Sequence, residues 1–192
     1  MKEHLNIAIR FTLVTTIIFG LLYPLSLTGL SQLLFPLQSN GSLLTRDGAI
    51  AGSSLIGQAF SADKYFHSRP SSAGTGYDAT ASSPSNLAPT NKQLIDRVHA
   101  DVLKLQQENS GQPIPIDLVT ASGSGLDPDI SPASASFQIA RVAKARGITP
   151  EQVQPLVQSH SQPRQFGILG EPRVNVLQLN LELDARYPVK NP

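Results

Sequence analysis

The longest run of hydrophobic positions in this 192-residue chain lies at its N-terminus. No charged residue occurs between Arg10 and Arg46, and residues 11–37 are dominated by Leu, Ile, Val, Phe and Thr. A helix that crosses the hydrocarbon core of a bilayer needs about 20 mostly apolar residues, each rising about 1.5 Å. The pattern therefore predicts a transmembrane helix over residues 11–37, preceded by a short segment at residues 1–10.

A cleaved signal peptide is the main alternative for this segment. The apolar part of a signal peptide spans only about 7–15 residues and is followed by a small-residue cleavage pattern such as Ala-x-Ala. The apolar run here is longer, and no such pattern follows it. A retained anchor is favoured, and the small residues Gly20, Ser26 and Gly29 would let another membrane helix approach closely.

The basic residues predict the orientation of this helix. Lys2 and Arg10 precede the apolar run, whereas Arg46 is alone close behind it. Basic residues near a membrane span favour the cytoplasmic side. We therefore expect residues 1–10 in the cytoplasm, a linker at residues 38–48, and an extracytoplasmic domain at residues 49–192.

Shorter hydrophobic patterns follow the linker. Residues 49–60 read as one or two short strands, and residues 65–69 as a further strand. Residues 68–89 are rich in Ser, Gly, Ala and Pro, and a loop of this length inside a compact domain is usually functional or disordered.

Three helices are expected in the second half of the chain. The first begins with a capping-box spacing at Thr90 and ends near Gly111. The second starts at Ser131-Pro132 and ends at Arg146-Gly147, with basic residues in its last turn. The third starts at Thr149-Pro150, and Pro155 is expected to limit its length.

The last pattern has a period of two. Leu177, Leu179, Leu181 and Leu183 alternate with polar residues, which predicts a strand with one solvated face. Because helices lie between the expected strands and no βαβ unit repeats, the fold class is predicted as α+β: one membrane helix followed by one compact α+β domain.

Composition excludes several kinds of chemistry. The net charge of +1 is spread without a basic cluster, which argues against nucleic acid as a partner. The chain has no cysteine, and its four histidines lack the paired spacing of a zinc site, so we expect no metal site. No phosphate-binding Gly-x-x-x-x-Gly-Lys-Ser/Thr loop occurs, and no catalytic residue is predicted. Ser61-x-x-Lys64 matches an acyl-transfer motif in only two residues and is interpreted as a surface turn.

A Gly-rich loop is one candidate binding feature. It lies between a short apolar run and the helix start at Ser131, and it consists of Ser122, Gly123, Ser124 and Gly125. Free amide groups and a helix dipole attract anions, so this loop is a candidate anion, nucleotide or interface loop. A well-capped connector is the commoner explanation of such a sequence.

A group of aromatic and charged residues is the other candidate. Tyr, Phe and Arg are the residue types that anchor protein interfaces, although they are equally at home in a core. The candidate partner interface consists of Tyr65, Phe66, Arg69, Tyr77 and Asp78.

Several sequence blocks resemble one known family. They are residues 52–58 (GSSLIGQ), 65–71 (YFHSRPS), 76–79 (GYDA), 85–87 (SNL), 89–91 (PTN), 117–132, 141–143 (RVA) and 169–177 (LGEPRVNVL). Together with the single N-terminal span, they are similar to the C subunit of the Kdp-type high-affinity potassium-transporting P-type ATPase. The likeness runs nearly from end to end of the chain.

The resemblance implies a function and partners. It implies an accessory subunit in a bacterial inner-membrane complex that imports potassium at the expense of ATP, together with a channel-like potassium-translocating subunit, a P-type ATPase subunit and a small one-span subunit. It also implies a catalytic chaperone that raises the ATP affinity of the pump subunit, so ATP is the one ligand suggested for a chain with no cofactor of its own. The alternative is a stand-alone anchored protein that binds a ligand between residues 71–89 and the loop at 122–125.

Overall fold

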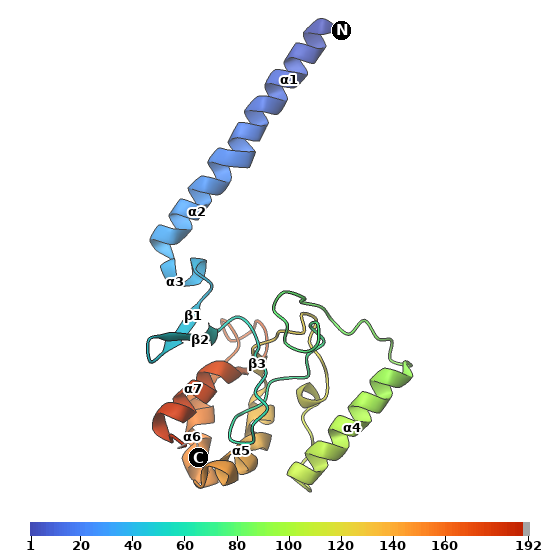
Figure 1. The fold of residues 1–192 in the computed structure, drawn as a ribbon, viewed down its shortest axis with the longest axis vertical. Coiled ribbons are helices and arrows are strands. Elements are labelled where there is room, and N and C mark those ends of the chain that lie inside the picture. Colours follow the sequence, from blue (N-terminus) through green and yellow to red (C-terminus); the bar gives the residue numbers. More distant parts are fainter. Residues whose placement is uncertain (190–192) are drawn as a thin grey trace. The chain divides into compact units, whose positions relative to one another are not determined.

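The structure, a computed structural model, describes residues 1–189 (Figure 1). The chain divides into two compact units between Leu43 and Leu44, inside the segment predicted to be a linker. The first unit is dominated by one long apolar helix. The second is a domain of mixed helix and sheet, as the sequence predicted.

The apolar helix of the first unit runs from Lys2 to Leu34. It comprises α1 (Lys2–Ile17), a π-helical turn η1 (Ile18–Leu22) and α2 (Tyr23–Leu34), and none of its residues is buried. The π-helical turn lies just before Pro24, whose ring nitrogen cannot donate to the helical hydrogen-bond ladder. The length and composition of the whole helix, from Lys2 to Leu34, are those of a helix that crosses a membrane.

Two hydroxyl groups of the helix bond to its own carbonyls. The hydroxyl of Thr15 donates to the carbonyl of Phe11 at 2.8 Å, and that of Thr28 donates to the carbonyl of Pro24 at 2.9 Å. Such bonds give each hydroxyl group a partner within the helix, which matters in an apolar environment. The helix ends at Phe35, which leaves helical geometry, and a short helix α3 (Pro36–Ser39) follows. The long helix therefore stops three residues before the expected end at Leu37.

A β-hairpin opens the second unit. Strands β1 (Leu43–Arg46) and β2 (Ala49–Ser53) pair across Asp47 and Gly48, both of which have positive φ. Two such residues suit the twist of a tight hairpin, and Asp-Gly is a favoured pair there. The expectation of a short strand within residues 49–60 is confirmed by β2, whereas β1 falls within the predicted linker.

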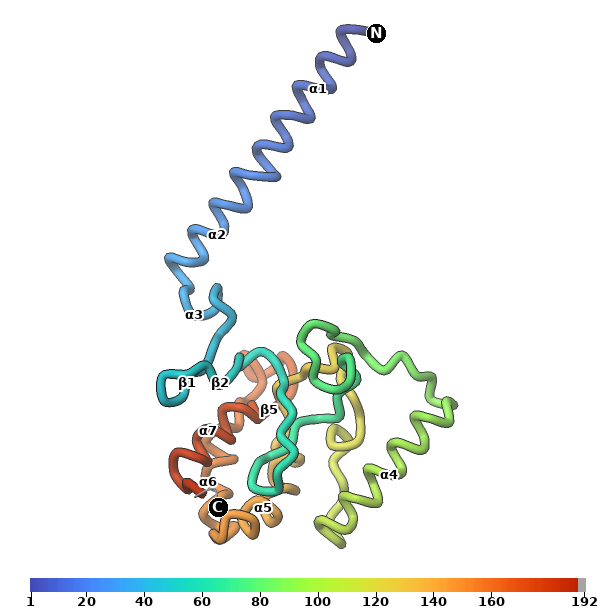
Figure 2. The backbone as a smooth tube through the Cα atoms, viewed as in Figure 1, coloured from blue at the N-terminus to red at the C-terminus, as the bar shows by residue number. Residues whose placement is uncertain are grey.

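No helix or strand occurs between Ser54 and Asn91 (Figure 2). This irregular stretch includes the long loop expected at residues 68–89. It is followed by α4 (Lys92–Glu108), which has no buried residue, and by a 3₁₀ turn η2 (Ile116–Leu118). The cap of α4 is Asn91 rather than Thr90, since the Asn91 side chain accepts from the amide of Gln93 at 2.8 Å.

Three helices and a small sheet form the core of the domain. The helices are α5 (Pro132–Arg146), α6 (Pro150–His160) and α7 (Val176–Arg186). The antiparallel sheet has the order β3-β5-β4, from β3 (Asp129–Ile130), β5 (Arg173–Asn175) and β4 (Ser161–Gln162). The main cluster of buried residues consists of Phe66, Ile130, Ala135, Ile139, Val142, Ala143, Val153, Leu156, Val157, Val174, Val176, Leu179 and Leu183.

The predicted signals at the ends of α5 and α6 are confirmed. Ser131 caps α5, and Gly147 ends it in the left-handed conformation with φ of 67°. Thr149 and Gln152 form a reciprocal capping box at the start of α6. The expectation that Pro155 would shorten α6 is wrong, because the helix continues to His160. Pro155 lies on the exposed side, where water can satisfy the carbonyl that loses its partner.

The strand predicted for residues 177–183 is also wrong, because these residues form α7. The buried positions Val176, Leu179, Asn180 and Leu183 follow the helical spacing of i, i+3, i+4 and i+7. One of these positions is a buried asparagine, so the apolar pattern alone showed only the alternating leucines. The side chain of Asn175 caps this helix by accepting from the amide of Gln178 at 3.1 Å.

Residues 65–69 do not form the expected strand either. The amide of Asn180 binds both backbone groups of Phe66, accepting from its N–H at 2.8 Å and donating to its carbonyl at 2.9 Å. The amide of Gln138 binds both backbone groups of His67 in the same way, at 2.8 and 3.1 Å. Two buried side chains from α7 and α5 thus replace the neighbouring strand, and we call this arrangement the amide clamp.

The amide clamp gives a first testable prediction. Replacing Asn180 by Ala leaves the buried N–H and carbonyl of Phe66 without partners and removes packed atoms, so the free energy of unfolding should fall by about 2–5 kcal/mol. Urea unfolding of the full chain in detergent, followed by circular dichroism, measures this change. Gln178→Ala on the half-buried side of the same helix should stay within about 0.5 kcal/mol of the parent, and equal losses for both variants would contradict the role of the clamp.

Candidate functional site

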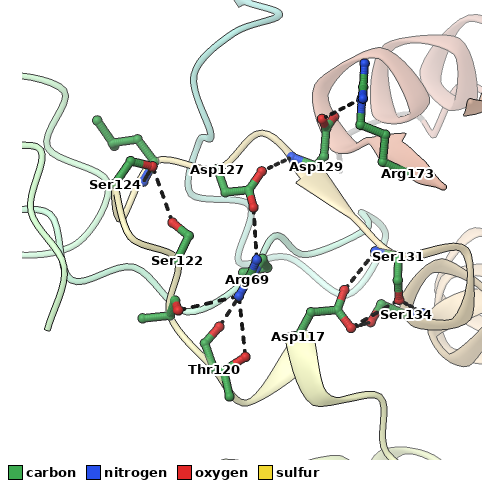
Figure 3. Close-up of polar contacts among 12 residues, drawn as sticks. Arg69, Asp117, Thr120, Ser122, Ser124, Asp127, Asp129, Ser131, Ser134 and Arg173 are labelled. Atoms are coloured by element: carbon green, nitrogen blue, oxygen red, sulfur yellow. Dashed lines mark hydrogen bonds and ion pairs between the residues drawn. The ribbon is translucent and has the colours of Figure 1, made fainter. Parts of the chain in front are cut away.

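The loop of Ser122 to Gly125 is closed by its own serine side chains (Figure 3). The hydroxyl of Ser122 accepts from the amide of Gly125 at 2.9 Å, and the hydroxyl of Ser124 accepts from the amide of Leu126 at 3.1 Å. Serine hydroxyls often imitate a backbone turn in this manner. Gly125 adopts φ of +68°, so the turn depends on a residue that tolerates the left-handed region.

The irregular stretch before α4 packs against this loop. Ser71 donates its hydroxyl to the carbonyl of Gly125 at 2.6 Å, while the amide of Ser83 and the hydroxyl of Ser82 both donate to the carbonyl of Ser124, at 3.0 and 2.9 Å. A Cβ atom on Gly125 would lie 2.6 Å from the carbonyl oxygen of Ser83. The structure thus brings the two loops of the candidate pocket together through direct hydrogen bonds.

Arg69 bonds to residues on both sides of the Gly-rich loop. Its guanidinium forms an ion pair with Asp127 at 3.0 Å and donates to the carbonyls of Thr120 at 3.3 Å and Ala121 at 3.4 Å (Figure 3). The hydroxyl of Tyr77 donates to the carbonyl of Arg69. Arg69, a residue of the candidate partner interface, therefore holds Thr120, Ala121 and Asp127, and Tyr77 holds the backbone of Arg69.

The N-terminus of α5 holds a carboxylate of the same chain. Asp117 accepts from the amide of Ser131 at 2.7 Å, from the hydroxyl of Ser131 at 3.1 Å and from the hydroxyl of Ser134 at 2.5 Å (Figure 3). A negative group is stabilised at this end of a helix by the free amides and the helix dipole. Asp117 therefore lies where the sequence suggested that an external anion would be attracted.

A groove of about 370 Å³ lies beside this network. Its lining includes Asp117, Asp127, Asp129, Arg69 and Arg173. Burial raises the pKa of the Asp129 carboxyl, and the charge of Asp127 adds to this effect, while Arg173 at 3.1 Å and the amide of Asn175 oppose it. Among residues 1–189, no three His, Asp or Glu side chains gather in a way that could hold a metal ion.

The remaining residues of the candidate interface differ in exposure. Phe66 is fully buried in the core, so its ring offers no surface to a partner. Asp78 accepts from the amide of Thr80 at 2.9 Å and from its hydroxyl at 2.7 Å, which closes a local turn and lowers the pKa of Asp78. Tyr65 is partly buried and donates its hydroxyl to Asp184 at 3.0 Å.

Asp184 is the centre of a network that the sequence did not reveal. Its carboxylate accepts from Arg46 at 2.5 Å and from Arg146 at 2.7 Å, in addition to Tyr65. Arg146 is completely buried and stacks over the ring of Tyr65 at 5.2 Å. Burial by itself raises the pKa of Asp184, but the hydrogen bonds from Arg146, Arg46 and Tyr65 outweigh it and hold that pKa below its usual value.

Sequence reasoning also missed the roles of Asp117, Gln138 and Asn180. Each is a polar residue that bonds a backbone group 14 to 114 positions away in the chain. Nothing in the local pattern distinguishes such a side chain from a solvated one. The single available signal was the position of Asn180 on the buried stripe of α7.

The architecture defines a class of protein before any comparison is made. One apolar N-terminal helix of spanning length precedes a single mixed helix-and-sheet domain, which fits a small protein with a single-pass membrane anchor. Comparison with known proteins then identifies the family. The family described as "KdpC: K+-transporting ATPase, c chain" matches residues 5–185, and the chain belongs to it.

Individual relatives agree along their whole length. A protein of Koribacter versatilis named "Potassium-transporting ATPase KdpC subunit" is 52% identical over 192 residues, covering 100% of both chains. A protein of Rhodospirillum rubrum with the same name is 53% identical over 191 residues and covers 98% of this chain and 99% of its own. These matches confirm the resemblance drawn from the sequence blocks.

The Asp184 network gives a pH-dependent prediction. A carboxyl whose pKa is lower in the folded state stabilises the fold above its unfolded pKa of about 3.9, and this stabilisation is lost as the pH falls through the folded-state value. Asp184→Asn should lower the free energy of unfolding at neutral pH by roughly 2 kcal/mol and should flatten the loss of stability below about pH 4. Urea unfolding between pH 2.5 and pH 7 measures both effects. Glu182→Gln on the same helix removes an exposed pair with Arg186 and serves as the control; a parallel acid profile for Asp184→Asn and the parent would contradict the assignment.

Proposed function

We propose that this chain is the accessory, non-catalytic subunit of an ATP-driven high-affinity potassium import complex, and that it is needed for assembly and activity of the complex. The observation that carries this proposal is the end-to-end match to proteins named as KdpC subunits of a potassium-transporting ATPase. A subunit that shares its full length with such relatives fits the same place in a corresponding complex.

The two units of the chain suggest a division of tasks. A single helix cannot enclose a pore or form a ring of selectivity-filter carbonyls, so potassium would cross the membrane through another subunit. The helix supplies an anchor and a packing surface, because Gly20, Ser26 and Gly29 allow close approach of a neighbouring helix. The proposed partners are the channel-like translocating subunit, the P-type ATPase subunit and the small one-span subunit.

The proposed orientation places residues 44–189 outside the cell, in the manner of a cap over the translocating subunit. Lys2 and Arg10 before the helix favour a cytoplasmic N-terminus in the bacterial inner membrane.

The proposed effect on ATP is an indirect one. With the domain outside, cytoplasmic ATP does not reach the loop of Ser122 to Gly125, and the N-terminus of α5 already holds Asp117. A higher ATP affinity of the pump subunit would then arise through subunit contacts that favour its nucleotide-binding state. The chain itself would need no nucleotide site for this effect.

The orientation can be tested by cysteine labelling, because the chain contains no cysteine. A Thr75→Cys variant carries one thiol at an exposed loop position, whereas Glu3→Cys carries one before the apolar helix. We expect a membrane-impermeant maleimide to label position 75 in intact cells and position 3 only after permeabilisation. The reverse labelling pattern would place the domain in the cytoplasm and refute the external cap.

The accessory role can be tested by truncation. A chain that ends after Ser42 keeps the apolar helix and lacks the second unit. Together with the other subunits, it should give a complex with little potassium-stimulated ATPase activity, or a complex that does not assemble, and any residual activity should need more ATP for half-saturation. A fully active complex with the truncated chain would exclude the proposal.

A matched control separates an accessory role from catalysis by this chain. Ser61 is exposed and belongs to the two-residue match to an acyl-transfer motif. In the complex with the full chain, Ser61→Ala should leave the potassium-stimulated ATPase activity unchanged.

A further inference from the structure

Residues 164–171 form an exposed apolar knob between β4 and β5. Phe166 is 90% exposed, Ile168 75% and Leu169 54%. These three neighbouring residues contrast with the single scattered apolar residues that are normal on a protein surface. The knob therefore needs an explanation that burial inside this domain does not provide.

The knob has a defined backbone conformation. Gln165 and Leu169 exchange both of their backbone hydrogen bonds at 2.9 Å, and these close a tight turn over Phe166, Gly167 and Ile168. Within the turn, the amide of Gly167 donates to the carbonyl of Arg164 at 3.1 Å. The turn is thus held by its own bonds, and its apolar side chains are left to point outward.

Phe166 adopts a conformation that bulky residues avoid. Its φ is +53°, in the left-handed region, and the next residue, Gly167, also has a positive φ, of +76°. A large side chain held in this region is uncommon, and such strain is concentrated at functional sites. The fold accepts this strain while the ring stays in solvent, which points to a contact made outside this chain.

The charged residues around the knob bear on whether it binds a lipid surface or a protein. At its base, the guanidinium of Arg164 donates to both carboxylate oxygens of Glu171, at 2.7 and 2.6 Å. The next basic residue, Arg173, is paired with Asp129 at 3.1 Å. A segment that binds a lipid surface combines apolar side chains with basic groups for anionic headgroups, over a larger apolar area than three residues provide. The paired arginines and the small apolar area favour a protein pocket.

We propose that the knob of residues 164–171 docks into an apolar pocket on another protein subunit of the same complex, with Phe166 as its central anchor. This inference rests on the proposed function, since it needs a protein partner outside the membrane. Aromatic side chains are enriched at the buried centres of interfaces, and a preformed turn loses little conformational entropy when it binds. The ion pair of Arg164 with Glu171 adds a charge-neutral polar contact at the base of the knob.

The test uses the assembled complex with the full chain. Phe166 is replaced by the photoreactive analogue p-benzoylphenylalanine, which keeps an aromatic side chain at the position, and the purified complex is irradiated. We expect a covalent adduct with another subunit, whereas the same analogue at the exposed polar position Gln106 on α4 serves as the control for unspecific reaction. Adducts with lipid alone or with a second copy of this chain, or equal adducts at both positions, would overturn the inference.

A second measurement uses polar substitutions. The pair Phe166→Ser and Ile168→Ser should weaken association of the chain with the other subunits by roughly thirty-fold or more, as for an interface centre. Ile95→Ser with Leu103→Ser replaces two apolar side chains of α4 that are 53% and 47% exposed, and it should change association little. Unchanged association of the knob variant would reject the inference. Because the substituted side chains are exposed, thermal unfolding of both variants should match that of the parent.

The proposed function can fail separately from this inference. Co-purification of the unaltered chain with the other subunits tests the accessory role, irrespective of the knob. If the unaltered chain does not co-purify, both proposals are wrong. If it co-purifies and position 166 reacts with no other subunit, the accessory role stands and the knob has been misassigned.

Discussion

The domain depends on the backbone of Phe66 and His67, which runs between two buried side-chain amides. Asn180 from α7 and Gln138 from α5 satisfy the N–H and carbonyl groups of these two residues. Because a buried backbone group without a partner is costly, an irregular segment can enter a core only where such partners are provided. The clamp lets the ring of Phe66 fill the space between the helices without a neighbouring strand.

The same principle extends outward from the core. Arg141 donates to the carbonyls of Asp63 and Tyr65, and Arg146 donates to the carbonyl of Lys64. Arg69 and Ser71 continue the pattern toward the central loop. The long irregular stretch is thus held by hydrogen bonds with the helices and loops that it crosses. The Gly-rich loop of residues 122–125 is one of these partners. Such an arrangement fixes the outer surface of the domain without large sheets.

The chain belongs to the KdpC family. Under the accessory role proposed above, it would need a firm attachment and a surface of defined shape more than a reaction centre. The apolar helix would meet the first need, and the ordered loops would meet the second. The apolar knob at residues 164–171 is a place where the fold leaves hydrophobic area uncovered and keeps its backbone fixed, as a preformed contact surface requires.

Elements with local causes could be predicted from the order of the amino acids. These elements are the apolar length of the first helix, the cap at Ser131, the capping box of Thr149 with Gln152 and the glycine at position 147. Each is encoded by residues close together in the chain, so the sequence pattern predicts it. The sequence blocks that resemble the family could also be recognised, because each is a short run of consecutive residues. Three features depend on contacts across the fold: residues 177–183 form a helix, residues 65–69 have no partner strand, and Asp117 lies at the N-terminus of α5. In each case the deciding partner is a buried polar side chain or a charge from a distant segment. Its effect depends on burial and proximity in space, and neither can be inferred from the pattern of neighbouring residues.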